Sequence, residues 1–488
     1  MELVISAVAG DLVNRFMSFL INKYRSEENI EDKTERLKDI LIRVHMIVEE
    51  ADGRYITNSM MLLQLKKLVG VMYRGYHVLD TIKYSTLHSS RAQQEVSSFS
   101  GMSFYNSINF LRTTKSTYIS HEIQSILETL ETNVSNMAEF VLLLGACDRV
   151  SRSPYDSYLY IDNFMFGRHV EKQQVINILM QENISPLSPT VIPIIGGTRV
   201  GKKTLIAHVC DNEKVRSKFP SILQINGENI SRIEHGHFIS GSRSLLVVEL
   251  HSDVDDENWL KFYSSAKQMG RGSKIVIISR ITKISRFGTV KPIHLYSLSH
   301  EEYSYLFKVL AFGSTNPEEQ PQLASIAKDL AAALGGTLVV ANVCADMLRK
   351  NQNVHFWLNI LKRYQNVVKN NFSVFGEHPK NLMEKGHPVD ITRFVSSSSS
   401  SQSSPTLRLM PPHLNEQHDS KKELPKVMFG DLIAGSAILP KEEFEMVTWE
   451  SRLPPYRRFV NLATYCVDEK ISQHHTASSS NKRQRFDM

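Results

Sequence analysis

Cysteine is scarce in this chain, and its placement excludes several classes of protein. Only four cysteines occur in 488 residues, and no two of them have the C-x-x-C spacing of zinc or redox sites. They are Cys147, Cys210, Cys344 and Cys466. A disulfide-rich secreted scaffold is therefore excluded, and the sequence predicts reduced, mostly buried thiols in a protein of the cytosol or nucleus.

Long apolar runs and a strong charge of one sign are also missing. No stretch approaches the roughly 18 apolar residues of a membrane span. The N-terminus begins Met1-Glu2 and is soon interrupted by Asp11 and Arg15, unlike a secretory signal. The formal net charge of +6 is spread along the chain and does not by itself indicate nucleic-acid binding. We expect an intracellular globular protein of about two to four domains.

The first 135 residues have the pattern of amphipathic helices. Apolar residues recur every three or four positions over 37–51, and further runs cover 60–82 and 123–144. Helices of this kind pack as a bundle. The pattern fits a domain whose apolar faces are all core, and equally one with a spare apolar face for a partner.

A different pattern follows a Ser/Tyr/Asp-rich joint at 151–163. A helix is expected over 171–180, and apolar runs bounded by turns predict strands at 191–195, 222–225, 245–248 and 274–279. Such runs suit strands buried on both faces of a parallel sheet with helices around it. Pro193 is expected near the start of its strand, because proline cannot donate to a sheet ladder.

Helices dominate again beyond the sheet. Ser299 to Glu302 is a capping-box pattern that opens a helix through Phe307. Another amphipathic helix is expected over 323–334, with Gly335 as its stop. Farther on, a serine tract at 396–401 lies in a polar region with several prolines, which is typical of a disordered linker.

The stretch 190–205 comes close to a phosphate-binding loop. In the pattern GxxxxGK[ST], backbone N–H groups wrap the phosphates, the lysine contacts the terminal phosphates and the hydroxyl holds Mg²⁺. Here the hydroxyl position carries a lysine, and a threonine follows one residue late. The candidate nucleotide-binding residues of this stretch are Gly196, Gly197, Gly201, Lys202, Lys203 and Thr204.

Two further strands end in charged residues. A phosphate-loop enzyme needs a carboxylate at the end of a second strand to organise Mg²⁺ and water, and Glu249 has that place. The next position, where a second acid often supports hydrolysis, is Leu250. Arg280 ends the strand 274–279 and is suited to sensing a γ-phosphate. Both charges also fit the plain alternative of strands that end at the surface.

Taken in order, these pieces resemble the plant intracellular immune receptors of the nucleotide-binding, leucine-rich-repeat class. The N-terminus resembles their Rx-type coiled-coil domain, and the segment from Tyr76 to Asp80 aligns with their E-D-V-I-D motif, keeping the last acid and the apolar spacing. Gly167-Arg168 resembles their motif beside the adenine, which makes Arg168 a candidate nucleotide contact. The segments 272–280, 298–307 and 336–341 resemble their sensor-arginine strand and the two blocks that follow it.

The resemblance implies a multidomain α plus α/β fold. The N-terminal helical bundle is followed by a P-loop NTPase-like parallel α/β domain with a small helical subdomain, then a linker and a small C-terminal region. The expected boundaries are 1–135 for the Rx-type domain, 136–165 for a linker, 166–295 for the nucleotide-binding (NB-ARC) domain, 296–370 for the helical subdomain, 371–423 for a Ser-rich disordered linker, 424–470 for a folded C-terminal segment and 471–488 for a disordered basic tail.

The chain also departs from the family pattern. Leu338 replaces the proline that approaches the adenine, Leu250 the second acid and Lys203 the Mg²⁺ hydroxyl. No M-H-D motif, complete second helical subdomain or leucine-rich repeat is found. The segment 424–466 resembles the C-terminal extension of truncated grass proteins of this class, which lack the repeats that a direct pathogen sensor normally uses.

Three functions remain open. The first is a truncated, immune-receptor-like protein of plant defence that holds ADP or ATP as a conformational cofactor, with Thr204 and Glu249 as the candidate ligands if Mg²⁺ binds. The second is a nucleotide-independent scaffold or decoy that pairs with full-length receptors through its helical N-terminus. The third is an active ATPase switch, which the departures disfavour; no catalytic residue is identified. We expect partners among immune receptors or signalling proteins, a cytoplasmic location, and nuclear entry if the tail Lys482-Arg483-Gln484-Arg485 is a targeting signal.

Overall fold

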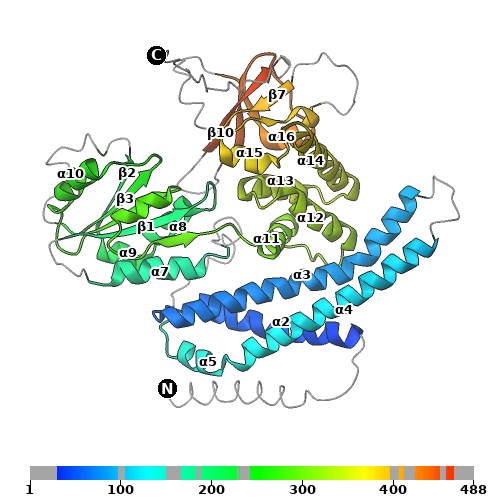
Figure 1. Ribbon diagram of the computed structural model, residues 1–488, viewed down its shortest axis with the longest axis horizontal. Helices are drawn as coiled ribbons and strands as arrows, with labels where there is room; N and C mark the ends of the chain where they lie inside the picture. The colour runs from blue at the N-terminus through cyan, green and yellow to red at the C-terminus, as the bar shows by residue number, and fades with distance from the viewer. Residues whose placement is uncertain are drawn as a thin grey trace, which may run out of the picture. The chain divides into compact units, whose positions relative to one another are not determined.

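The computed structural model describes residues 30–96, 105–149, 166–182, 188–227, 230, 242–395, 406–411, 424–450 and 458–466 (Figure 1). It divides into two compact units, Met1–Leu361 and Lys362–Met488, and the division falls within the helix α14, Val354–Phe375. The joint at 151–163, the serine tract at 396–401 and the basic tail lie outside the described residues.

The N-terminal part of the first unit is a helical bundle. Its helices are α2 (Ile30–Asp52), α3 (Ser59–Val96), α4 (Tyr105–Ser135) and α5 (Ala138–Gly145). The three-and-four spacing of α2 places Leu37, Leu41 and Val44 in a core shared with α3, α4 and α5. Gly75 of α3 permits a close approach, since a Cβ there would lie 2.7 Å from Leu41. The helical bundle predicted from periodicity is confirmed.

The end of this bundle differs from the expectation. The helix predicted over 123–144 is interrupted at Asn136 and Met137 and continues as α5. Ser135 bonds with its hydroxyl to the carbonyl of Glu131 at 2.6 Å, the kind of local bond that competes with helix continuation. Phe140 of α5 is buried in the bundle core, so the first part of the expected linker 136–165 is part of the bundle.

A parallel five-stranded sheet forms the centre of the next part. The strands are β1 (Thr190–Gly196), β2 (Ser221–Asn226), β3 (Ser244–Leu250), β4 (Lys274–Ser279) and β5 (Ile293–Leu295). Their order is β2-β3-β4-β1-β5, and every pair is parallel. The α/β fold expected from the apolar runs is confirmed.

Helices cover both faces of this sheet. On one face, alternate strand residues such as Ile192 and Ile194 pack against α7 (His169–Met180), α8 (Lys202–Cys210) and α9 (Glu213–Lys218). On the other face, Val191 and Ile195 share a core with α10 (Asp256–Ala266) and the 3₁₀ helix η2 (Thr282–Phe287). Burial on both faces explains why these strands are continuous apolar runs.

Pro193 lies in the middle of β1 rather than near its start. It pairs with Ile277 of β4, whereas pairing of β1 with β5 begins only at Ile194. Proline is tolerated here because no strand of the sheet pairs with it on the second side. Gly288 takes up that space, since a Cβ on it would lie 2.5 Å from the proline ring.

Helices follow the sheet within the first unit. They are α11 (His300–Phe312), α12 (Pro321–Leu334), α13 (Leu338–Lys350) and the start of α14. The capping box at Ser299 and Glu302 is formed, and Gly335 ends α12 in the left-handed conformation, both as predicted. Trp357 is fully buried and donates its indole N–H to the carbonyl of Asn351 at 2.8 Å.

The second unit holds a second five-stranded sheet, with strand order β6-β7-β10-β9-β8. Its elements after α14 are α15 (Pro379–Lys385), β6 (Val389–Asp390), η3 (Thr392–Phe394), β7 (Thr406–Leu409), β8 (Lys426–Met428), α16 (Phe429–Ala434), β9 (Phe444–Glu450) and β10 (Arg458–Cys466). The structured part of 371–423 therefore differs from the disordered linker that its serine content suggested. Leu407 and Leu409 are buried in β7, and Asn371 bonds through its side chain to the backbone of Asp390.

Candidate functional site

The loop between β1 and α8 has glycines at two positions where the backbone geometry favours glycine. Gly196 ends β1 where a Cβ would lie 2.4 Å from the carbonyl oxygen of Leu295, so no larger residue fits. Gly201 stands directly before α8 in the left-handed region, at φ 93°, which favours glycine. A Cβ on Gly197 would meet only Val200 at 3.6 Å, an ordinary contact. Backbone geometry thus explains why Gly196 and Gly201 are glycines, whereas Gly197 has room for a side chain.

Lys202 folds back over this loop. Its ammonium group donates to the carbonyl oxygens of Gly196 at 2.8 Å and Gly197 at 2.5 Å. The pKa of Lys202 is lowered to about 8, mainly by burial; Glu249 raises it in part, and the positive charges of Lys203 and Arg280 lower it. Three cations, Lys202, Lys203 and Arg280, therefore act near one carboxylate, Glu249, and this excess of positive charge suits an anion.

Lys203 and Glu249 form an ion pair at the carboxyl edge of the sheet. The Lys203 ammonium lies 2.5 Å from Glu249 Oε1, and the two side chains are 46% and 25% exposed. His251 Nε2 lies 3.6 Å from the same oxygen. The lysine at the predicted metal-hydroxyl position thus contacts the predicted metal-organising acid.

The start of α8 is regular. Lys202 is its first residue, and the N–H of Leu205 donates to the carbonyl of Gly201 at 2.8 Å. No extra residue bulges between Gly201 and the helix. Thr204 is exposed in the first turn, one position after the ion-paired Lys203.

Arg168 contacts the loop from the beginning of α7. It is almost fully buried and donates to the carbonyl oxygens of Val200 and Tyr296. Burial lowers its pKa below the usual value for arginine. The predicted nucleotide contact thus holds the phosphate-loop backbone to the segment after β5.

Arg280 follows β4 and is exposed at the same edge of the sheet. The preceding residue, Ser279, is buried and donates its hydroxyl to the carbonyl of Leu250 at 2.9 Å, which ties the ends of β3 and β4 together. Arg280 acts electrostatically on Lys202. The structure therefore gathers Lys202, Lys203, Glu249 and Arg280 at one edge.

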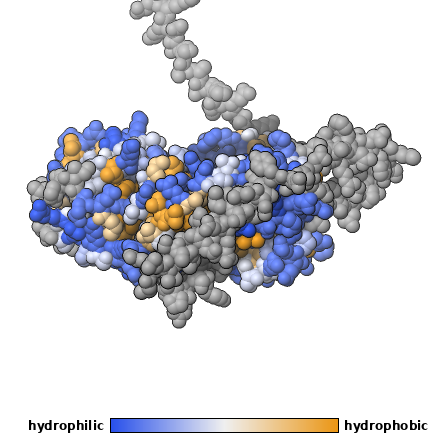
Figure 2. Space-filling view, turned by 90° about the horizontal axis from the view of Figure 1, so that it is seen from below, coloured by the Kyte–Doolittle hydropathy of each residue, from blue (hydrophilic) through white to orange (hydrophobic). Residues whose placement is uncertain are grey.

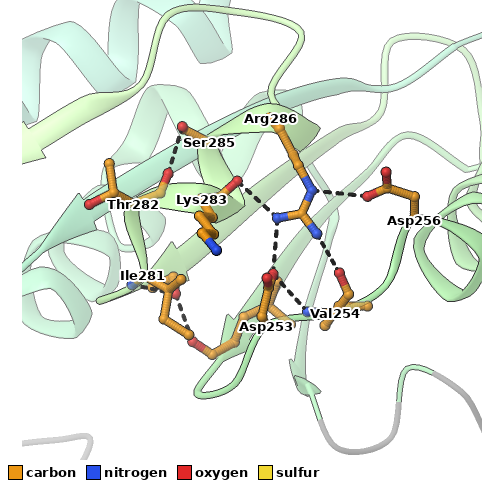
Figure 3. A network of polar contacts seen from close by, with 10 residues as sticks. Asp253, Val254, Asp256, Ile281, Thr282, Lys283, Ser285 and Arg286 are labelled. Atoms are coloured by element: carbon orange, nitrogen blue, oxygen red, sulfur yellow. Dashed lines mark hydrogen bonds and ion pairs between the residues drawn. The ribbon is translucent and has the colours of Figure 1, made fainter. Parts of the chain in front are cut away.

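Sequence reasoning missed a polar network beside these strands, shown in Figure 3. Arg286 of η2 bonds to Asp256 and Asp253, both at 2.9 Å, and to the carbonyl of Val254 at 2.6 Å. The bonds that Arg286 donates to Asp256 and Asp253 raise the pKa of Arg286, and the arginine in turn lowers the pKa of Asp253. The network fastens the loop after β3 to the turn after β4. Its residues belong to no motif, so only tertiary structure reveals it.

The sequence also did not show that α3 packs against α11 and α12. Lys308 of α11 lies 2.5 Å from Asp80, the acid retained from the E-D-V-I-D pattern, and both side chains are largely buried. Lys328 of α12 donates to the hydroxyl of Thr81 at 2.6 Å. The outer residues Lys83 and Glu318 form another ion pair at 2.8 Å.

Aromatic rings complete this contact. Tyr73 lies 5.0 Å from the rings of both Phe166 and Tyr305, and Tyr76 lies 5.2 Å from Tyr305. Met72 is buried in the bundle core. Met72 and Tyr73 of α3 are thus buried within the chain itself, and Tyr76 is partly covered by Tyr305.

Exposed apolar residues remain elsewhere on the bundle. Figure 2 shows one face on which hydrophobic side chains gather in places among hydrophilic ones. On the described bundle helices the exposed large apolar residues are Ile42, Met46, Met60, Leu63, Leu142 and Leu143. Across the described ranges, no helix is both long and apolar enough to span a bilayer.

Comparison with known proteins connects this architecture to plant disease resistance. Residues 8–110 match the Rx N-terminal domain family, a range that includes α2 and α3. The putative disease resistance protein RGA4 of Solanum bulbocastanum is 23% identical over 381 residues, which cover 72% of this chain and 37% of that protein.

Two further relatives agree. The disease resistance protein RGA2 of Solanum bulbocastanum is 22% identical over 72% of this chain and 38% of its own length. The putative disease resistance RPP13-like protein 1 of Arabidopsis thaliana is 21% identical over 69% of this chain and 35% of its own length. The chain therefore spans well under half the length of the curated relatives it matches.

Proposed function

We propose that this chain, which belongs to the plant disease-resistance proteins with an Rx-type N-terminal domain, functions in plant defence as a nucleotide-dependent regulatory protein. It binds ADP or ATP as a conformational cofactor at the loop between β1 and α8 and acts through protein contacts. The observation that carries the proposal is the loop itself, in which Gly196 and Gly201 shape the backbone and Lys202 begins a helix at the edge of a parallel sheet.

The other predicted nucleotide contacts support this proposal. Arg168 holds the loop in place, and Arg280 and Lys203 add positive charge at the same edge. The E-D-V-I-D-like segment is fastened to α11 through Asp80, so a change in the nucleotide-binding part has a physical connection to the N-terminal bundle. The proposed location is the cytoplasm, with nuclear entry only if the basic tail is a targeting signal.

Efficient ATP hydrolysis is not part of the proposed function. Leu250 is buried where a second acid would stand, and its carbonyl accepts the bond from Ser279. The ammonium of Lys203 forms an ion pair with the carboxylate of Glu249, in the place where a metal would be organised. Two of the groups that position metal and water are therefore replaced.

A nucleotide-independent scaffold is the second candidate, and a specific observation favours it. The Lys202 ammonium bonds to two carbonyls of its own loop, an arrangement that satisfies the lysine without a phosphate. In this case the protein pairs with full-length receptors, and its loop is only a remnant of a site.

One experiment separates the two candidates. The full chain is purified from plant tissue and denatured, and the supernatant is assayed for adenine nucleotide beside a Lys202→Ala preparation. Release of ADP by the wild type and its loss in the variant support the cofactor role. If the wild type releases no adenine nucleotide and also binds neither ADP nor ATP in calorimetry, the result supports the nucleotide-independent scaffold.

A further inference from the structure

The Lys203–Glu249 pair occupies the place where a phosphate-binding loop organises Mg²⁺. In the loop pattern, the residue after the phosphate lysine supplies a hydroxyl to the metal, and the acid at the end of β3 supports the metal's shell. Here the first position is a cation, and it lies 2.5 Å from the second. The side chains of Lys203 and Glu249 are in contact, but the positive charge of the Lys203 ammonium repels Mg²⁺.

The surrounding groups do not restore a magnesium site. Mg²⁺ requires oxygen ligands in near-octahedral geometry and is repelled by nearby ammonium and guanidinium groups. Glu249 already contacts Lys203 and has His251 at 3.6 Å. Thr204 does not take the missing role, because α8 begins regularly at Lys202 and leaves this hydroxyl one position late. The residues present therefore do not fit Mg²⁺.

The same groups do fit a polyphosphate that carries no metal. Lys202 lies over the loop, Lys203 lies beside β3, and Arg280 follows β4, so three cations stand at one edge with one carboxylate among them. These cations outnumber the carboxylate, and the excess positive charge can offset the charge of phosphate oxygens in place of Mg²⁺.

We propose that the Lys203 ammonium, held by Glu249, replaces Mg²⁺ at this site, so that the chain binds ADP or ATP as the metal-free polyphosphate. The inference rests on the proposed function, since it specifies the form of the nucleotide that the same loop binds. Glu249 positions the Lys203 ammonium instead of organising a metal and water.

Calorimetry of the full chain with ADP and ATP, in EDTA and in excess Mg²⁺, tests the inference. We expect the wild-type affinity for ADP and ATP to be at least as high in EDTA as in excess Mg²⁺. Lys203→Met, which removes the charge and offers no metal ligand, loses about tenfold in both conditions, as expected for a charge-assisted phosphate contact. Lys203→Thr, which restores the hydroxyl, binds weakly in EDTA and regains affinity with Mg²⁺.

Two controls keep the outcomes distinct. Lys261→Thr removes a lysine that is ion-paired with Glu257 on the exposed side of α10, and it leaves nucleotide affinity unchanged in both conditions. Thermal unfolding of every variant checks that the substitution leaves the fold intact.

The inference is overturned if the wild type binds nucleotide only with Mg²⁺, or if Thr204→Ala abolishes a Mg²⁺-dependent affinity. The proposed nucleotide cofactor survives both results. Absence of wild-type binding in EDTA and in Mg²⁺ overturns the proposed function and this inference together.

Discussion

At the residue scale, the most informative side chains are two adjacent lysines with different surroundings. Lys202 is partly buried against loop carbonyls, whereas Lys203 is half exposed and reaches the end of another strand. The sequence predicted their positions in the loop from the glycine spacing. It could not predict their contacts, because a lysine side chain has four rotatable bonds and its direction depends on groups far away in the sequence.

Lys202 gives the first prediction. Its replacement by alanine removes the ammonium that would contact the terminal phosphates, and nucleotide affinity falls by more than about 1.4 kcal/mol, or roughly tenfold. Calorimetry of wild type and Lys202→Ala measures this loss. Lys261→Ala serves as the control for a change of equal charge on an exposed helix. Equal affinity in wild type and Lys202→Ala contradicts the assignment.

At the element scale, periodicity located most helices and strands correctly. The spacing of Leu37, Leu41 and Val44 predicted the core face of α2, and the apolar run 274–279 coincides with β4. Boundaries were less accurate, since α11 extends five residues past Phe307, to Phe312. Local pattern shows which face is apolar, but hydrogen bonds and caps decide where an element ends.

The sequence did not predict which distant segments pair with each other. In the second unit, β7 pairs with β10, and Leu409 faces Ala463 across the sheet. A four-residue strand near a serine tract has too little alternation to be recognised alone. The same limit hid the Arg286 network and the contact of α3 with α11, which exist only after folding.

The ion pair between Asp80 and Lys308 gives a prediction about the α3–α11 contact. Removing one partner leaves the other largely buried, so Asp80→Asn destabilises the first unit by about 1–3 kcal/mol. Denaturant unfolding of Asp80→Asn, Lys308→Met and the double variant measures the coupling between them. Glu35→Gln, in the exposed pair with Lys38, is the control and costs at most about 1 kcal/mol. Additive effects at Asp80 and Lys308 would show that the pair does not hold these helices together.

His77 predicts how the same contact responds to acid. It lies 5.2 Å from His300, and burial lowers its pKa below 6.5, helped by the positive charge of Lys328. His77 therefore binds a proton more tightly in the unfolded chain, where its pKa is near 6.5, than in the folded chain. The folded state loses stability as the pH falls from 6.5 through the lower pKa of folded His77.

Unfolding midpoints at pH 7.5 and 5.5 measure this loss. The wild type is less stable at the lower pH, and His77→Asn, which cannot titrate, loses less between the two conditions. An equal loss in both proteins assigns the acid sensitivity to other groups, of which His300, Glu301 and Asp80 are the neighbours that also act on His77.

At the scale of the whole molecule, the chain joins a helical bundle, a phosphate-loop sheet and a set of helices within one unit, and adds a second unit with its own sheet. The order of motifs predicted the first three parts, because each motif belongs to a definite strand or helix. No motif described the second unit, so the sequence did not predict its sheet.

The last prediction concerns the outer face of the bundle. The face of α3 that carries Tyr73 and Tyr76 packs on α11, so a partner must use another surface. Ile42 and Met46 are 59% and 57% exposed and stand one helical turn apart on α2, which makes them apolar neighbours on one face. Exposed apolar groups of this kind are suited to burial at a protein interface.

The test is co-precipitation from plant tissue with the full chain as bait. The double variant Ile42→Ser with Met46→Ser is expected to lose the immune receptors that the wild type recovers, because two apolar anchors are removed without touching the bundle core. Leu260→Ser, which changes an equally exposed apolar residue on α10, retains them. If wild type and double variant recover the same proteins, or the wild type recovers only chaperones and is a monomer by light scattering, then this face of α2 is plain surface and the bundle serves only its own contact with α11.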